Sequence, residues 1–159
     1  MRLCLHERND LRNQCMAILY NVGMSKAYTT TIPATLDEVT KAYAFLSEVL
    51  DSHAIPPKVA LRINVALDEA ISNVARYAYD HPNGFYTIKV LVEEHRLEIE
   101  IRDKGKEYNP LLAKEPDVHA PLEDRGIGGY GVFIIKKFMN SVHYKHEADE
   151  NVLTFDILF

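Results

Sequence analysis

Two short segments in the C-terminal half of the chain constrain its fold more than any other feature. Residues 103–110 read Asp-Lys-Gly-Lys-Glu-Tyr-Asn-Pro, and residues 125–131 read Arg-Gly-Ile-Gly-Gly-Tyr-Gly before an apolar stretch with helical character. Four glycines in six residues are costly unless the backbone requires them. Backbone N–H groups at a helix start attract anions, so an acid and a glycine at a strand end, followed by glycines at a helix start, suit a nucleotide.

Each segment also has an ordinary explanation. Asp-Lys-Gly is good turn chemistry after a strand, and a glycine-rich turn is a weak motif when it stands alone. The polar segment between them contains Pro116 and Pro121 and has no helical or strand period. Connections this long without structure of their own are usually functional or disordered, which favours the functional interpretation.

Composition predicts one ordinary globular domain and excludes several classes of function. The chain has 159 residues, of which 47% are hydrophobic and 26% charged. A net charge of -5 without a basic stripe argues against nucleic acid as a partner. No apolar run approaches the roughly 20 residues that span a bilayer, and no signal peptide is recognisable. The only cysteines, Cys4 and Cys15, fit a reducing cytoplasm better than a disulfide framework.

The pattern of apolar residues predicts an α+β fold. Residues 1–23 are expected to be an N-terminal extension, disordered or not native, and residues 24–159 the domain. Expected strands cover residues 27–32, 85–93, 96–102, 141–146 and 152–159, and expected helices cover residues 36–50, 57–79 and 132–139. Because the strands come mostly as neighbouring hairpins, we expect a mixed sheet with helices on one face.

The helix over residues 57–79 carries a polar pair on the sector away from its apolar face. Glu69 and Asn73 are four residues apart, so their side chains lie one above the other. A carboxylate beside a carboxamide oxygen can hold Mg²⁺, and such a carboxylate can act as a base. Taken alone, the pair is more often the solvated face of an amphipathic helix.

The three features in this order resemble the GHKL ATPase superfamily, whose fold is called the Bergerat or histidine kinase-like ATPase fold. More narrowly, they resemble the stand-alone anti-sigma factor serine/threonine kinases. Residues 67–79 match the N box of that family, residues 103–110 its G1 box and residues 126–131 its G2 box. The resemblance covers roughly residues 24–159. It implies a two-layer α/β sandwich with a mixed, mostly antiparallel sheet, and it implies ATP and Mg²⁺ as cofactors.

The resemblance also implies a role for each motif residue. Asn73 is expected to supply the Mg²⁺ ligand, and Glu69 to be the base that orients or deprotonates the attacking hydroxyl. Asp103 is expected to accept a hydrogen bond from the adenine amino group, and Gly105 to let the base approach the backbone. The chemistry implied is phosphoryl transfer driven by positioning and electrostatics.

Further ATP-binding residues follow from the same resemblance. The glycines expected to wrap the phosphates with backbone N–H groups are Gly126, Gly128, Gly129 and Gly131. Arg125 is expected to add charge at the γ-phosphate. Asn151 stands where the superfamily often has a threonine near the adenine, and Tyr130 stands where the family commonly has leucine. An asparagine can still hydrogen-bond there.

Three functions fit these features. The first is a cytoplasmic ATP-dependent kinase that phosphorylates a small STAS-type antagonist (anti-anti-sigma) protein and so controls a sigma factor; family members are often homodimers. The second is a nucleotide-gated module that sequesters a regulator without significant kinase turnover. The third is ATP hydrolysis linked to dimerisation, which ranks lowest because no coupling domain is recognisable. Glu69 favours the kinase, since a pure binder needs no base. The seven histidines show no zinc-ligand spacing.

Overall fold

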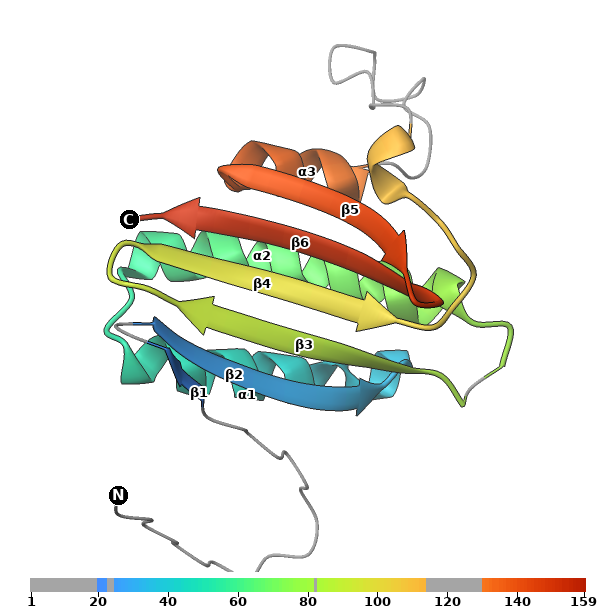
Figure 1. The fold of residues 1–159 in the computed structure, drawn as a ribbon, viewed down its shortest axis with the longest axis horizontal. Helices are drawn as coiled ribbons and strands as arrows, with labels where there is room; N and C mark the ends of the chain where they lie inside the picture. Colours follow the sequence, from blue (N-terminus) through green and yellow to red (C-terminus); the bar gives the residue numbers. More distant parts are fainter. Residues whose placement is uncertain (1–19, 23–24, 82, 114–129) are drawn as a thin grey trace, which may run out of the picture.

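The computed structural model describes residues 20–22, 25–81, 83–113 and 130–159, in which helices cover one face of a six-stranded sheet (Figure 1). The strands follow the spatial order β1-β2-β3-β4-β6-β5. They are β1 (Tyr20–Val22), β2 (Ser25–Pro33), β3 (Phe85–Val92), β4 (Arg96–Asp103), β5 (Ser141–Glu147) and β6 (Glu150–Leu158). The predicted α+β two-layer sandwich is confirmed. Within the described ranges every strand pairing is antiparallel, so the parallel pair that a mixed sheet requires does not occur there.

The helices begin and end close to the predicted positions. They are α1 (Val39–Ser52), preceded by the 3₁₀ turn η1 (Leu36–Glu38), then α2 (Pro57–Asn73) and α3 (Tyr130–Phe138). A π-helical turn, η2 (Val74–Ala78), continues α2, and a 3₁₀ turn, η3 (Pro110–Leu112), lies in the segment after β4. None of the described helices has the length and apolar character needed to cross a membrane.

Alternating side chains of the central hairpin form the floor of the core. In β4 every second residue is buried, including Ile99 and Ile101, and β3 contributes Ile88 in the same way. These residues belong to one buried cluster with Ile63 and Leu67 of α2, none of which exposes more than 2% of its surface. Burying a side chain of this size stabilises the fold by about 1.5–3 kcal/mol, which fixes α2 against the sheet.

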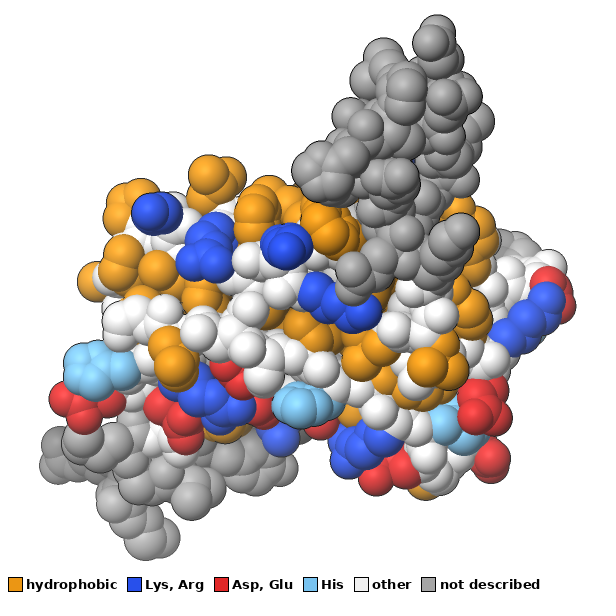
Figure 2. Space-filling model, turned by 90° about the horizontal axis from the view of Figure 1, so that it is seen from above, with side chains coloured by type: hydrophobic (Ala, Val, Ile, Leu, Met, Phe, Trp, Pro, Cys, Tyr) orange, Lys and Arg blue, Asp and Glu red, His pale blue; other side chains and the backbone are white. Residues whose placement is uncertain are grey.

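The opposite face of the sheet is polar. Arg102 donates to Glu100 at 2.8 Å and to Glu150 at 3.3 Å. Figure 2 shows acidic and basic side chains together on the sheet side, whereas hydrophobic side chains with interspersed lysine and arginine occupy the helix side. Partly exposed ion pairs of this kind contribute only about 0–1 kcal/mol each, so the hydrophobic layer under the helices holds the fold together.

The segment expected to be an extension contributes one short strand. β1 pairs with β2 in the register Tyr20↔Ala27 to Val22↔Ser25, at one edge of the sheet. β1 therefore adds to the sheet from within residues 1–23, and the domain boundary at residue 24 stays a prediction.

Candidate functional site

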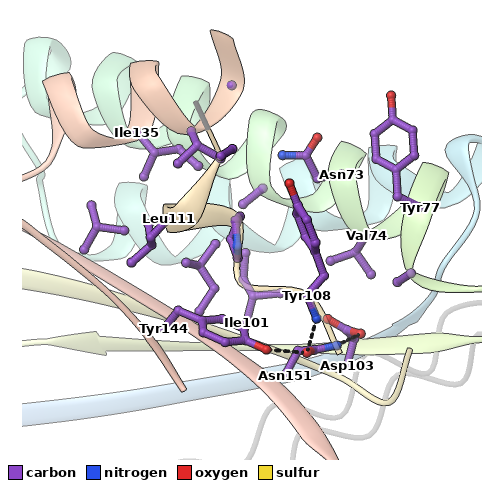
Figure 3. Close-up of a pocket in the computed structure, with 18 of the residues that line it drawn as sticks. Asn73, Val74, Tyr77, Ile101, Asp103, Tyr108, Leu111, Ile135, Tyr144 and Asn151 are labelled. Atoms are coloured by element: carbon purple, nitrogen blue, oxygen red, sulfur yellow. Dashed lines mark hydrogen bonds between the residues drawn. The ribbon is translucent and has the colours of Figure 1, made fainter. Parts of the chain in front are cut away.

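A cavity of about 560 Å³ lies between the end of α2 and the strands β4, β5 and β6 (Figure 3). This is within the 300–1,000 Å³ typical of small-molecule and cofactor sites. Its walls are mostly apolar, with a small number of polar side chains that enter from different elements. The polar residues predicted from the sequence that line it are Asn73, Asp103 and Asn151.

Asp103 is the last residue of β4 and is buried, with 7% of its surface exposed. Its Oδ1 accepts hydrogen bonds from the Gly105 backbone N–H at 2.8 Å and from Asn151 Nδ2 at 2.9 Å. Burial raises the pKa of the Asp103 carboxyl, while these two hydrogen bonds act in the opposite direction. Both hydrogen bonds that Asp103 accepts within the described part of the chain end on Oδ1, which leaves Oδ2 without a hydrogen-bond donor there.

Asn151 is the direct neighbour of Asp103 across the sheet, because the β4–β6 register pairs the two residues. Its Nδ2 also donates to the Lys106 carbonyl oxygen at 3.0 Å. Its Oδ1 accepts from the Tyr144 hydroxyl at 2.8 Å and from the Tyr108 backbone N–H at 3.3 Å (Figure 3). The structure thus brings the predicted Asp103 and Asn151 together, with two tyrosines that the sequence motifs did not single out.

Gly105 has a structural requirement that the sequence analysis did not foresee. A Cβ at this position would lie 2.4 Å from the Ala78 carbonyl oxygen, at the end of η2. The Lys106 backbone N–H donates to that same oxygen at 2.8 Å. The Tyr79 hydroxyl accepts from the Lys104 N–H at 2.8 Å and donates to the Phe85 carbonyl at 2.7 Å. Gly105 therefore lets the loop after β4 pack directly against the helix end, which forms one wall of the cavity.

Glu69 and Asn73 meet the first turn of α3. A Cβ added to Gly131 would lie 2.5 Å from Glu69 Oε2 and 3.5 Å from Asn73 Nδ2. Nearer the start of α2, the Arg62 guanidinium lies 5.7 Å from the centroid of the Phe138 ring. This sector of α2 packs against α3, and Glu69 and Asn73 are both half-buried, so the pair is not simply a solvated helix face. Gly131 and Asn73 both line the cavity that holds Asp103.

The surroundings of Glu69 shift the pKa of its carboxyl group. Burial raises the pKa of its carboxyl, the neighbouring Asp68 carboxylate raises it further, and the Arg76 guanidinium lowers it. Asp68 itself accepts hydrogen bonds from the hydroxyl groups of Tyr43 and Ser72. A partly buried carboxyl with a raised pKa at the edge of a cavity is typical of a general base.

Four of the predicted ATP-binding residues lie outside the described residues. They are Arg125, Gly126, Gly128 and Gly129. Of the described parts of the three motifs, Asn73, the Asp103 loop and Gly131 line one cavity, and Glu69 lies beside Gly131. Tyr144 carried no signal in the sequence, because its place in the site depends on a strand register that composition and spacing do not encode. Tyr108 lies within the 103–110 segment, but the sequence did not predict that its backbone N–H would bond to Asn151.

Comparison with known proteins gives one family and several relatives. The family of histidine kinase-like ATPase domains matches residues 32–157. The serine/threonine-protein kinase BtrW of Bordetella bronchiseptica is 24% identical over 132 residues, which cover 82% of this chain and 92% of BtrW. The serine-protein kinase RsbW of Listeria monocytogenes is 25% identical over 135 residues, covering 82% of this chain and 86% of that kinase. RsbW of Bacillus mycoides is 30% identical over 95 residues, or 57% of this chain and 59% of that kinase.

Proposed function

We propose that this chain, which belongs to the family of histidine kinase-like ATPase domains, binds ATP with Mg²⁺ and phosphorylates a serine or threonine of a small antagonist protein. One observation carries the proposal. Asn73 and Gly131 line the same cavity as Asp103, and Glu69 lies beside Gly131, so the proposed phosphate-binding and base-recognition groups would share one pocket. The names of the kinase relatives support the enzyme class.

The adenine would lie at the sheet end of the cavity. Asp103 Oδ2 would accept a hydrogen bond from the exocyclic amino group, which is the donor that distinguishes adenine from an unsubstituted purine. Ile101, Val74 and Leu153 line the cavity and provide apolar contacts for a flat ring. A buried carboxylate that accepts a hydrogen bond from the correct base discriminates strongly, because a base without the donor leaves the carboxylate unpaired.

The phosphates would lie at the α3 end. The first turn of α3 presents backbone N–H groups and the positive end of the helix dipole beside Gly131. Gly126, Gly128 and Gly129 would extend this cradle, and Arg125 would add positive charge. The Asn73 carboxamide suits Mg²⁺, which prefers oxygen ligands and is usually held by one or two protein groups and the substrate phosphates. When bound, the ion would neutralise charge that develops on the phosphate oxygens.

Glu69 would act on the attacking hydroxyl. The bond between the γ-phosphorus and the bridging β–γ oxygen breaks, and a bond forms between that phosphorus and the serine or threonine oxygen. The hydroxyl proton passes to the Glu69 carboxylate, and ADP leaves with the electron pair of the broken bond. Because transfer of this kind depends on alignment and charge, the half-buried carboxylate needs only to be correctly placed and ionised.

The partner is proposed as a STAS-type antagonist in a system that controls a sigma factor. A pull-down from the native host, in the presence of ATP and separately of ADP, followed by mapping of phosphosites, tests this. We expect an antagonist that is phosphorylated on serine or threonine only with ATP. Capture of proteins without any nucleotide-dependent phosphorylation would contradict the proposal.

Substitution of the base separates transfer from binding. Glu69→Gln is expected to keep ATP affinity, measured by calorimetry, and to lose phosphate transfer from γ-labelled ATP. Glu48→Gln provides the matched control, since Glu48 is an exposed carboxylate on α1. Transfer by Glu69→Gln at the rate of this control would rule out the base assignment. Absence of transfer by the wild-type protein would instead leave a binding module.

A further inference from the structure

The side-chain amide of Asn151 has no hydrogen-bonding capacity left for a ligand. An asparagine amide has two N–H donors and an oxygen with two lone pairs. Here Nδ2 donates to Asp103 Oδ1 and to the Lys106 carbonyl oxygen, and Oδ1 accepts from the Tyr144 hydroxyl and the Tyr108 N–H. The residue is buried, with 7% of its surface exposed. A nucleotide could bond to Asn151 only by displacing one of these partners.

These partners also fix the orientation of the amide. A carboxylate and a carbonyl oxygen can only accept, so they must face the amide nitrogen. The backbone N–H of Tyr108 can only donate, so it must face the amide oxygen. A flipped amide would oppose like groups at three of its four contacts, and the observed arrangement is therefore the one that the network selects.

The network ties three separate elements to the predicted base-recognition group. It reaches from β6 to the end of β4 through Asp103, to the loop after β4 through Lys106 and Tyr108, and to the edge strand β5 through Tyr144. Asn151 and the Gly105 N–H together hold Oδ1 of Asp103, which sets the rotation of that carboxylate. Figure 3 shows this chain from Tyr144 through Asn151 to Asp103 along the floor of the cavity.

We propose that Asn151 is a positioning residue, not a contact to the base, and that Tyr144 holds it in place so that Asp103 presents Oδ2 to the amino group of the purine. This inference rests on the proposed ATP site and adds Tyr144 to it as a residue that sets base specificity. The specificity of the site then depends on a hydroxyl on a neighbouring strand.

The test compares the affinity of the protein for ATP with its affinity for purine riboside triphosphate, which lacks the 6-amino group. The wild-type protein should prefer ATP, and Asp103→Asn should abolish this preference. Tyr144→Phe removes one hydrogen bond to Asn151 without altering the shape of the ring. It should lower ATP affinity by about three- to tenfold, while affinity for the analogue falls less than twofold. Asn151→Thr should reduce the preference for ATP by at least as much.

Two matched controls lie on the opposite face of the sheet from Tyr144 and Asn151, because side chains of alternate residues point to opposite faces. His143 is exposed and precedes Tyr144 on β5, and Thr154 is its direct partner on β6. His143→Ala and Thr154→Ala should leave both affinities unchanged. Thermal denaturation confirms that each variant is folded, and Tyr144→Phe keeps the test decisive if Asn151→Thr does not fold.

Two results would overturn the inference. An equal loss of affinity for both nucleotides in Tyr144→Phe and Asn151→Thr would mean that Asn151 contacts a part of the nucleotide that the two ligands share. Unchanged affinities would mean that the network does not position Asp103. A wild-type protein without preference for ATP, with Asp103→Asn indistinguishable from it, would instead refute the proposed adenine site itself.

Discussion

Replacement of Gly131 by alanine tests whether activity depends on the close approach of α3 to Glu69 of α2. The substitution separates this effect on activity from any effect on the stability of the fold. The new methyl group would lie 2.5 Å from Glu69 Oε2, and contacts of a Cβ below 3.0 Å essentially never occur. The carboxylate would therefore have to retreat by about 0.9 Å to reach ordinary contact at 3.4 Å. Because the obstructing atom is the end of a flexible side chain, Glu69 can move without displacing either helix.

The substitution is expected to change stability and activity in opposite directions. Alanine favours a helix over glycine by about 1 kcal/mol, so the melting temperature should stay the same or rise by about 2–4 °C. A catalytic group displaced by about 1 Å can cost about 100-fold in rate, so transfer should fall by about 10- to 100-fold. A variant that is at least as stable but much less active is the expected result, because the glycine serves the site and not the helix.

The assay measures transfer of the labelled γ-phosphate to the antagonist purified from the native host, with ATP affinity and melting temperature determined in parallel. Lys137→Ala, at an exposed position of α3, is the matched control. Transfer by Gly131→Ala at the rate of Lys137→Ala would refute the account of why a glycine stands beside Glu69. A large loss of melting temperature would show that the glycine is required by packing.

Two more sets of substitutions test the protonation of Glu69 and the packing of the loop after β4. The proposed base can act only when ionised, and burial raises the pKa of the Glu69 carboxyl above its ordinary value. Transfer should therefore fall as the pH drops through a value higher than that at which an ordinary glutamate titrates. In a plot of transfer rate against pH, Asp68→Asn should move the fall on the acidic side to lower pH, and Arg76→Gln should move it to higher pH. Curves for both variants that coincide with that of the wild type would argue against Glu69 as the titrating group. Gly105→Ala places a methyl group 2.4 Å from the Ala78 backbone oxygen, which cannot rotate away. We expect a loss of about 1–3 kcal/mol and a melting temperature roughly 2–12 °C lower, whereas a melting temperature equal to that of the exposed-loop variant Lys104→Ala would contradict the packing argument.

The elements that could be predicted from the sequence are those with a strong local period. The β3–β4 hairpin alternates buried side chains with more accessible ones along its length, and the ranges expected for it agree with the structure within a residue or two. The order of the three motifs also predicts that Asp103 and Asn73 share one pocket, which they do. Local pattern thus predicts the elements, and motif order predicts which segments share the cavity.

The remaining features depend on contacts between distant segments. The bonds of Asn151 to Asp103 and Tyr144 follow from the registers of β6 with β4 and β5, since a one-residue slip would turn these side chains to the other face. The expected role of Gly105 in making room for a base stays a prediction, whereas the close approach of Gly105 to the Ala78 backbone has no signal in the sequence. The π-helical turn η2 after Asn73 has no recognisable sequence signal, although such turns often occur at functional sites.

Calorimetric titration of the purified chain with ATP, with Mg²⁺ and with EDTA, tests the central claim most directly. The account predicts that Mg²⁺ strengthens ATP binding and that Asn73→Ala removes this dependence. Asn64→Ala, a carboxamide on the same helix that bonds to the Ala60 carbonyl, should behave as the wild type. No ATP binding by the wild-type protein, or an unchanged response to Mg²⁺ in Asn73→Ala, would contradict the account.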